Sequence, residues 1–345
     1  MKNLKYDNRE PLEQVLSNYD INTQSIITET YKDKKAVWWV QTDKGLLVLK
    51  KISNSEQTLK YIMSAIKHLG ENGIYLPSVI KTKNGMDYAI TDRTCYVLST
   101  AVKGKNPSYD SANELEIIIK ELARFHLASE GFRVLPDTKP KIHLGMWKEN
   151  LTSRLEDIKG FYDKEVSAKG SNEIGAFIIT EFPYFQKRAL SAISALGEDY
   201  LSWVEKVRQR GGLCHQDFAA GNLILSPSGK LYVLDTDGIT VDLPARDIRK
   251  ILCKVMKKKG KWDIELTKSI LKTYQSVNPL TPAEWRVVKA DIEYPHLFMG
   301  AVNKYYYRRD KEWTEEKYFR RIKEMCAFEK TIAPVLDNYE KLIPY

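Results

Sequence analysis

The stretch that decides the fold reads HQDFAAGNLILSPSGKLYVLD, from His215 to Asp235. Two apolar runs flank the turn residues Pro227-Ser228-Gly229, a pattern that predicts an antiparallel hairpin. A two-residue loop at Ser228-Gly229 would place Asn222 opposite Asp235. Directly opposed residues carry their side chains on the same face, so we expect this amide and carboxylate to meet at the open end of the hairpin.

Oxygen donors in this stretch suit a hydrated magnesium ion. Asp217 lies in the loop before the hairpin, where Gly221 permits a tight turn. Mg²⁺ prefers carboxylate and carbonyl oxygens and keeps several waters, and phosphoryl transfer also needs one carboxylate near the attacking hydroxyl. Asp and Gly are also common in turns that have no chemical role. The spacing H-x-D-x-x-x-x-N with a later aspartate matches a kinase catalytic loop, so we predict Asn222 and Asp235 as metal ligands and Asp217 at the hydroxyl.

The pattern along the chain predicts an α+β protein with two lobes. Strands at 36–40 and 46–52 flank a turn that ends at Gly45, apolar residues between Leu59 and Leu69 recur at helical spacing, and Asn84-Gly85 marks a second hairpin. The expected helices of the remainder lie at residues 111–130, 146–168, 172–209, 243–277 (interrupted near Gly260) and 281–340. We therefore predict a small antiparallel-sheet lobe over residues 1–101 and a large, mainly helical lobe over residues 102–345.

Composition excludes several classes of protein. No apolar run among the 345 residues approaches the roughly 18 residues that cross a bilayer, and no secretory signal precedes the first strand, so we expect cytoplasmic synthesis and no membrane partner. The four cysteines are widely spaced, which fits neither a disulfide framework nor a zinc site. The net charge of +9 suits anionic partners. The basic run 254–261 has no interleaved aromatics, so nucleic acid is an unlikely partner.

Three segments carry a resemblance to a known family. They are Leu213–Ile224, Glu121–Phe132 and Gly45–Lys50. In them the sequence resembles the aminoglycoside phosphotransferase and choline kinase branch of the protein-kinase-like superfamily. Within that branch it is similar to the CotS-like bacterial spore coat proteins, over most of the chain.

The resemblance implies a role for each residue of the catalytic stretch. Asp217 would be the catalytic base, and Asn222 and Asp235 would bind Mg²⁺. His215 would brace the catalytic loop. Asp247, at the start of the next expected helix, would tie that helix to the loop.

The resemblance also places ATP against the amino-terminal sheet. Lys50 would contact the α and β phosphates, while Lys51 should point to the opposite face of the strand. Ser99 and Ala101 belong to the segment whose backbone would meet adenine. Glu56 is the candidate partner of Lys50, with Glu71 as the alternative.

Two features depart from the kinase pattern. Residues 28–35 contain no glycine, so a glycine-rich phosphate loop is missing. The usual Asp-Phe-Gly is replaced by a segment in which Asp237 either adds a second metal contact or closes the turn. His126, on the apolar helix 111–130, is expected to be a packed, hydrogen-bonded histidine.

Three functions remain open from the sequence. The first is a small-molecule kinase that transfers phosphate from ATP to a hydroxyl. The second is a structural spore coat component with a kinase-like fold and little or no activity, which the missing glycine loop favours. The third is a protein kinase acting on coat proteins, which the short stretch 235–247 disfavours. For the first two we expect synthesis in the mother cell, location in the spore coat, and other coat proteins as partners.

Overall fold

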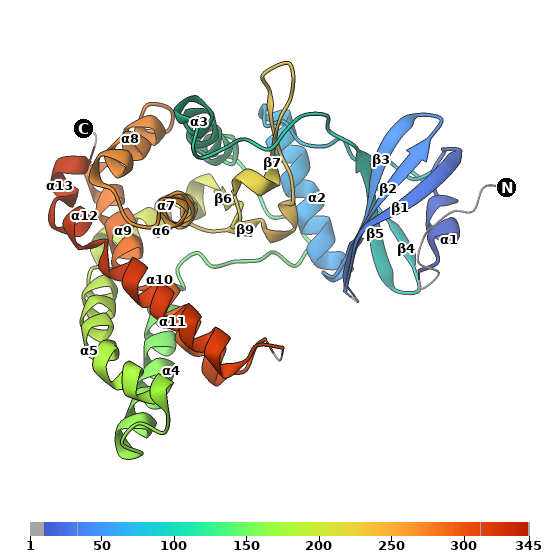
Figure 1. The fold of residues 1–345 in the computed structure, drawn as a ribbon. Helices are drawn as coiled ribbons and strands as arrows, with labels where there is room; N and C mark the ends of the chain where they lie inside the picture. Colours follow the sequence, from blue (N-terminus) through green and yellow to red (C-terminus); the bar gives the residue numbers. More distant parts are fainter. Residues whose placement is uncertain (1–9, 33, 311, 344–345) are drawn as a thin grey trace. The chain divides into compact units, whose positions relative to one another are not determined.

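A computed structural model describes residues 10–32, 34–310 and 312–343, and its chain forms two compact units (Figure 1). The first unit contains the residues up to Ser108 together with Gly131–Lys141 and Asp217–Thr240. The second contains Tyr109–Glu130, Ile142–Gln216 and the residues from Val241 onward. The first unit therefore includes the hairpin around residue 228. The division into functional lobes at residue 101 stays a prediction.

The first unit is built on a five-stranded antiparallel sheet with the order β1-β2-β3-β5-β4. The elements are α1 (Leu12–Leu16), β1 (Thr23–Lys32), β2 (Lys35–Thr42), β3 (Gly45–Ile52), α2 (Glu56–Glu71), β4 (Ala89–Thr91) and β5 (Thr94–Thr100). The predicted β2–β3 hairpin is confirmed, because Thr42 pairs with Gly45 across a two-residue turn. The predicted helix is confirmed as α2, whose amino end is capped by the Ser55 side chain.

The two faces of this sheet differ in what their side chains contact. Trp38, Val40 and Leu49 are fully buried on one face, where they pack in a core cluster with α1. Residues that alternate with them point to the other face, because successive side chains of a strand point in opposite directions. Lys51 lies on the same face of β3 as Leu49 and pairs with Glu10. The predicted opposition of Lys50 and Lys51 is confirmed by these contacts.

One prediction about the sheet was wrong, and one strand was missed. Asn84-Gly85 forms a turn, with the Gly85 N–H donating to the Thr82 carbonyl at 2.8 Å, but it does not join two strands. β4 pairs instead with β5, across a turn at Asp92 and Arg93. Strand β1 was not expected because it is mostly exposed, and Ile26 is its one fully buried residue, so its sequence carries little hydrophobic signal.

The hairpin of β7 (Leu223–Leu225) and β8 (Leu231–Val233) has a different register from the predicted one. Leu223 pairs with Val233, and the Leu234 N–H donates to the Asn222 carbonyl at 2.8 Å. The loop has three residues rather than two, because Gly229 takes φ +79° and donates to the Ser226 carbonyl at 2.9 Å. A turn followed by a left-handed glycine is a common three-residue hairpin connection. Asn222 therefore lies opposite Leu234, and the prediction that strand pairing sets it opposite Asp235 was wrong.

The segment after β5 pairs with this hairpin. Lys105 and Leu225 exchange two backbone hydrogen bonds, of 3.1 and 2.8 Å. Gly104 makes this approach feasible, since a Cβ there would lie 2.4 Å from the Leu225 carbonyl oxygen. The linker after the sheet and the hairpin are thus joined within the first unit.

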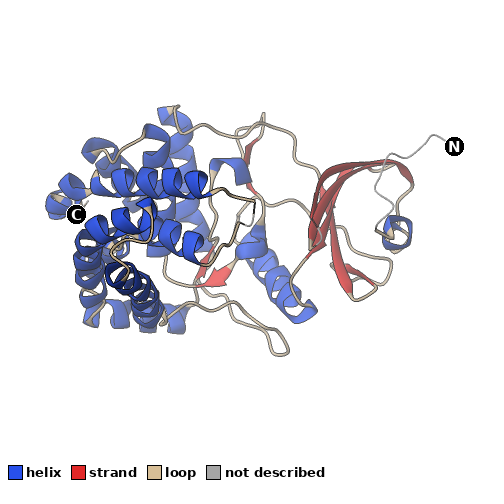
Figure 2. Cartoon of the chain, turned by 60° about the horizontal axis from the view of Figure 1, so that its bottom comes forward, coloured by secondary structure: helices blue, strands red, loops and turns tan. Residues whose placement is uncertain are grey.

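The second unit is mainly helical (Figure 2). Its helices are α3 (Ala112–Ala128), α4 (Trp147–Ser167), α5 (Glu173–Ser194), α6 (Glu198–Arg210), α7 (Ala245–Lys259), α8 (Ile264–Gln275), α9 (Pro282–Glu293), α10 (His296–Tyr306), α11 (Glu315–Lys330), α12 (Ala333–Asp337) and α13 (Tyr339–Leu342), with a two-stranded sheet of β6 (Leu213–Cys214) and β9 (Thr240–Val241). The predicted interruption at Gly260 is confirmed, where the residue ends α7 with φ +80°. None of the described helices is long and apolar enough to cross a membrane.

Candidate active site

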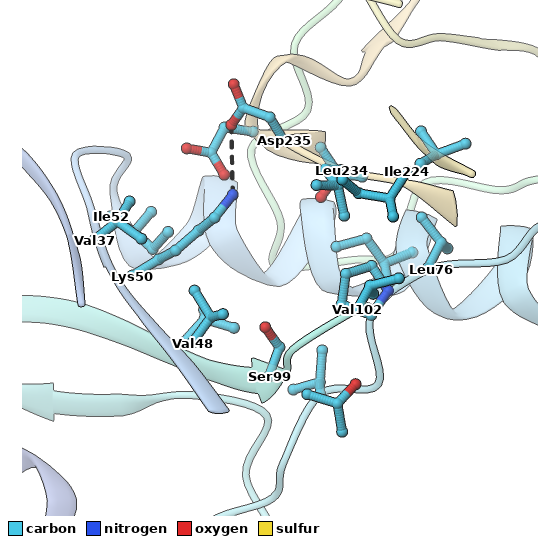
Figure 3. A pocket seen from close by; sticks show the side chains of 18 of the residues that line it. Val37, Val48, Lys50, Ile52, Leu76, Ser99, Val102, Ile224, Leu234 and Asp235 are labelled. Atoms are coloured by element: carbon cyan, nitrogen blue, oxygen red, sulfur yellow. Dashed lines mark ion pairs between the residues drawn. The ribbon is translucent and has the colours of Figure 1, made fainter. Parts of the chain in front are cut away.

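An apolar pocket of about 240 Å³ lies in the first unit (Figure 3). Its walls come from β2, β3 and β5, from α2, and from the β7–β8 hairpin with the residues that follow it. Figure 3 shows Val48 and Ser99 on the sheet side, Ile224 and Leu234 on the hairpin side, and Lys50 extending toward Asp235. A mostly apolar cavity with a few charged groups at one end is the usual form of a small-ligand site.

Lys50 and Asp235 form the ion pair at the polar end of the pocket. The Lys50 Nζ lies 3.6 Å from Asp235 Oδ1, and the side chains are 31% and 47% exposed. Lys50 is held on the pocket face by its pairing with Val37 and Val97 on the two flanking strands. Asp235 follows β8 in a left-handed conformation with φ 52°, which Asp tolerates better than most residues. The separation exceeds hydrogen-bond length, so the carboxylate oxygens stay accessible to a ligand.

Glu56 does not pair with Lys50. Its carboxylate lies 3.0 Å from the Lys60 Nζ and accepts a hydrogen bond of 2.9 Å from the Tyr88 hydroxyl. Glu56 occupies the first turn of α2, so the lysine one turn later captures it. The alternative, Glu71, pairs with Lys67 at 3.9 Å. Within the described residues, the ion pair of Lys50 is therefore made by Asp235 and by neither glutamate.

Asp217 and Asn222 are joined at the start of the hairpin. The Asn222 Nδ2 donates to the Asp217 side chain and to its carbonyl, both at 2.9 Å. A short 3₁₀ turn, η1 (Ala220–Asn222), brings the two residues together. The Asn222 side-chain oxygen takes no part in these bonds, and the Asp217 side chain is exposed. The pair thus presents oxygen acceptors to solvent.

The two residues before Asp217 belong to the second unit and are held in place by hydrogen bonds within it. The buried carboxylate of Asp247 accepts hydrogen bonds from the backbone N–H groups of His215, at 2.6 Å, and Gln216, at 2.9 Å. Burial opposes ionisation of Asp247, but its hydrogen bond and charge interaction with His126 outweigh burial and lower its pKa. His126 is buried and contacts the Tyr274 hydroxyl at 2.7 Å, so its predicted packed role is confirmed.

Lys250 also holds Gln216 in place, a role that the sequence did not predict. Its Nζ donates to the carbonyl and the side-chain oxygen of Gln216, at 2.6 and 2.7 Å. Gln216 has φ 71°, a conformation that costs a non-glycine residue about 1 kcal/mol. The spacing of Lys250 three residues after Asp247 is the only sequence signal for this contact.

A buried cluster next to this brace has metal-ligand residue types. His126, Cys214 and Asp247 offer donor atoms within 4.8 Å of one another, and no other such group occurs among the residues the structure describes. Burial raises the pKa of the Cys214 thiol well above its usual value, and the thiol donates to the Leu243 carbonyl at 3.1 Å. A protonated thiol that already has a partner is a poor ligand, so the cluster serves as packing behind the loop.

The predicted adenine segment lies along the pocket at the end of β5. Ser99 lines the cavity and pairs with Val48. Thr100 and Val102 also line it, while the Ala101 N–H donates to the Leu46 carbonyl at 3.2 Å. The segment thus offers side chains on the pocket face, and the Ala101 N–H is used by the sheet.

The sheet, pocket and charged pair together define the protein-kinase-like class of phosphotransferase folds. The chain belongs to the family described as "Spore coat putative kinase YutH", whose profile matches residues 13–339. It is 30% identical to spore coat protein S of Bacillus subtilis over 333 residues, which cover 95% of this chain and 93% of that protein. The family resemblance stated from the sequence is therefore confirmed. The same three segments also predict that the nearest likeness is to spore coat protein CotI, and this finer identification stays a prediction.

Solved structures confirm the fold class. An aminoglycoside phosphotransferase from Alicyclobacillus acidocaldarius superposes with a TM-score of 0.82 at 17% identity, over 98% of this chain and 97% of that one. Spectinomycin phosphotransferase, solved with ADP and spectinomycin, superposes with a TM-score of 0.63 at 12% identity, over 95% and 99% of the chains. The predicted α+β, two-lobed kinase-like fold is correct.

Proposed function

We propose that the protein is an ATP-dependent phosphotransferase of the spore coat, acting on a hydroxyl group of a small molecule. The observation that carries this proposal is the Lys50–Asp235 pair at one end of an apolar pocket. Apolar walls suit a purine base, and a lysine beside an aspartate suits the phosphates and their metal ion. Membership of a kinase-like family supports the same chemistry.

Each site residue has a role in this proposal. Adenine lies between Val48 and Ile224, near Ser99 and Ala101, and Lys50 contacts the α and β phosphates. Glu56 is not needed, because Asp235 pairs with Lys50. Asp217 accepts the proton of the attacking hydroxyl. His215 and Asp247 brace the loop that presents Asp217.

Asn222 and Asp235 are the residues that would hold Mg²⁺. The donor set fits, because an amide oxygen and an accessible carboxylate are the hard ligands that this ion prefers. When bound, Mg²⁺ would neutralise charge on the phosphates. Asp217 is hydrogen-bonded to Asn222 at 2.9 Å, so it lies close to this proposed ligand, and its side chain is exposed, where an acceptor can reach it.

The acceptor and the location follow from the relatives. Spectinomycin phosphotransferase was solved in complex with the small molecule spectinomycin, so we propose a small-molecule acceptor here as well. The similarity to spore coat protein S supports location in the coat after synthesis in the cytoplasm of the mother cell. Other coat proteins would then be its partners.

A second function is a structural coat component with little or no activity. The observation that favours it is the absence of glycine from residues 28–35, a range that includes the end of β1 and the start of β2. Backbone N–H groups of a glycine-rich loop normally cover the phosphates of a kinase substrate. A protein without this loop could keep the fold and lose the chemistry.

Nucleotide binding and turnover separate the two functions. We expect Mg-ATP to raise the melting temperature of the wild type, since a ligand of the native state stabilises it by about 2.7 kcal/mol at a concentration one hundred times Kd. Asp235→Ala should abolish this shift. Asp87→Ala is a matched control, because Asp87 is 44% exposed and lies 3.7 Å from Lys81, and it should keep the shift.

Asp217→Asn distinguishes catalysis from binding. This variant should bind Mg-ATP as the wild type does but lose ATP consumption in the presence of a panel of small alcohols and sugars. A wild type that shows no shift at millimolar Mg-ATP would contradict the phosphotransferase proposal. A shift without turnover of any acceptor would favour the structural coat function.

A further inference from the structure

Two further lysines of the first unit converge on Asp237. The Lys35 Nζ lies 3.2 Å from Asp237 Oδ2, and the Lys141 Nζ donates to the Asp237 carbonyl at 2.6 Å. The three residues come from the β1–β2 hairpin, from the segment 131–141, and from η2 (Thr236–Gly238). Asp237 itself lines the apolar pocket. This contact therefore stands at the same pocket as Lys50 and Asp235.

Strand geometry directs Lys35 to the pocket face. Val37 and Trp39 line the pocket from β2, and Lys35 shares their side of the strand because alternate residues point the same way. Val37 in turn pairs with Lys50 on β3. Lys35 and Lys50 thus lie on one face of the sheet, and each reaches an aspartate of the segment after β8.

The charges at this end of the pocket do not balance. Lys50 is matched by Asp235 and Lys35 by Asp237, whereas Lys141 bonds to the backbone carbonyl of Asp237 and brings no further carboxylate. Partial burial lowers the pKa of Lys141, and the nearby charge of Lys35 acts in the same direction against the attraction of Asp237. Three ammonium groups therefore face two carboxylates. An incoming anion would relieve this excess of positive charge.

We propose that Lys35 and Lys141 hold the terminal phosphates of the nucleotide, and that Asp237 is their counter-ion before the nucleotide binds rather than a metal ligand. This inference rests on the proposed function, since it assigns phosphate contacts within the same site. The hairpin that carries Lys35 contains no glycine and cannot wrap phosphates with its backbone in the usual way. Lysine side chains supply the missing positive charge.

A phosphate group can readily replace the Asp237 carboxylate as the partner of Lys35. The Lys35 side chain is 54% exposed, and an exposed ion pair is a weak one. A phosphate group carries more charge than a carboxylate and offers three acceptor oxygens. Binding of a polyphosphate would therefore draw Lys35 away from Asp237 at little cost.

The test compares adenosine with ATP. Titrations of the wild type, Lys35→Gln and Lys141→Gln are carried out by calorimetry, with Mg²⁺ present. We expect each variant to bind ATP about tenfold more weakly, the usual effect of losing a charged hydrogen bond, and to bind adenosine as the wild type does. Lys141→Arg keeps the charge and should retain most of the ATP affinity.

Lys44→Gln is the matched control. Lys44 is also 54% exposed and also pairs with an aspartate, Asp20 at 2.9 Å, at the β2–β3 turn of the same sheet. Its ATP affinity should equal that of the wild type. The inference is overturned if Lys35→Gln and Lys141→Gln bind ATP as tightly as Lys44→Gln, or if they lose adenosine and ATP affinity equally.

Asp237→Asn tests the assignment of the counter-ion. Without its competing carboxylate, the variant should bind ATP about two- to fivefold more tightly in EDTA, the range expected for releasing an exposed ion pair. It should also keep the gain in affinity that Mg²⁺ gives the wild type. Loss of that gain, as expected for Asp235→Asn, would make Asp237 a metal ligand and refute the assignment.

The proposed function and this further inference are contradicted by different results. A wild type that binds neither adenosine nor ATP removes the proposed function and this inference with it. A wild type that binds ATP while the lysine variants are unaffected removes only the inference. The adenosine titrations report whether the apolar walls are intact in each variant.

Discussion

Lys50 and Lys51 are neighbours with opposite expected effects when each is changed to methionine. Lys51 points to the core face and pairs with Glu10 at 2.5 Å, with side chains 14% and 6% exposed. Lys50 points to the pocket and its partner is half exposed. The same substitution at adjacent positions therefore separates a stability role from a binding role.

The loss in the free energy of unfolding expected for Lys51→Met depends on the surroundings of Glu10. Breaking a buried ion pair on one side costs about 3–5 kcal/mol, because the remaining charge is buried without its partner. The hydroxyls of Tyr31 and Tyr96 still donate to the Glu10 carboxylate, so we expect the low end, about 3 kcal/mol. Lys50→Met breaks a more exposed pair and should cost about 0–1 kcal/mol.

Guanidinium titration measures the free energy of unfolding, and calorimetry measures ATP affinity. Lys51→Met should lose stability and keep the ATP affinity of its native fraction. Lys50→Met should keep stability and lose at least tenfold in affinity, since a charged hydrogen bond to phosphate is removed. Equal losses of stability in the two variants, or a loss below about 1 kcal/mol for Lys51→Met, would refute the assignment of the two faces.

Three further predictions concern the loop brace, a buried histidine and the hairpin. Asp247→Ala leaves the buried N–H of His215 and the half-buried N–H of Gln216 without their acceptor, and it should lower the free energy of unfolding by about 2–6 kcal/mol in a guanidinium titration. The exposed Asp163→Ala should cost under about 1 kcal/mol, and similar losses in the two variants would contradict the brace. Burial and then the charge of Arg249 lower the pKa of His296 to about 3 despite Asp291. The native state therefore keeps this histidine neutral, while the unfolded chain takes up a proton. The contribution of His296 to the free energy of unfolding should be constant above about pH 6.5 and fall by up to about 1.4 kcal/mol per pH unit below it. His296→Gln should remove this contribution. Deleting Ser228 shortens the hairpin loop to two residues and should abolish ATP binding in a fluorescence titration, whereas Ser228→Ala should leave it intact.

The contact of Asp217 with Asn222 was predictable from the sequence because the two residues are close together in the chain. Asp217 and Asn222 are five residues apart, and they meet within one short turn. The opposition of Lys50 and Lys51 follows from strand alternation alone. Local rules of spacing and side-chain direction were sufficient for both predictions.

The register of the hairpin was not predictable by counting. A three-residue loop and a two-residue loop share the sequence Pro227-Ser228-Gly229, and the left-handed conformation of Gly229 decides between them. The contacts of Asp237 were not predictable either, because its partners lie 96 and 202 residues away. Lysines at such separations give no local signal, and only the folded sheet brings them to one place.

Pairing of the linker with the hairpin has a consequence for the kinetics of nucleotide binding. Lys105 and Leu225 exchange two hydrogen bonds, so the segment after β5 and the strand that carries Ile224 move as one body. The conformational entropy of ordering these two pocket walls is lost during folding and not during association. The end of the pocket beside Ile224, where we propose that adenine binds, is thus pre-organised. Adenosine should then bind in a single phase whose observed rate rises linearly with its concentration.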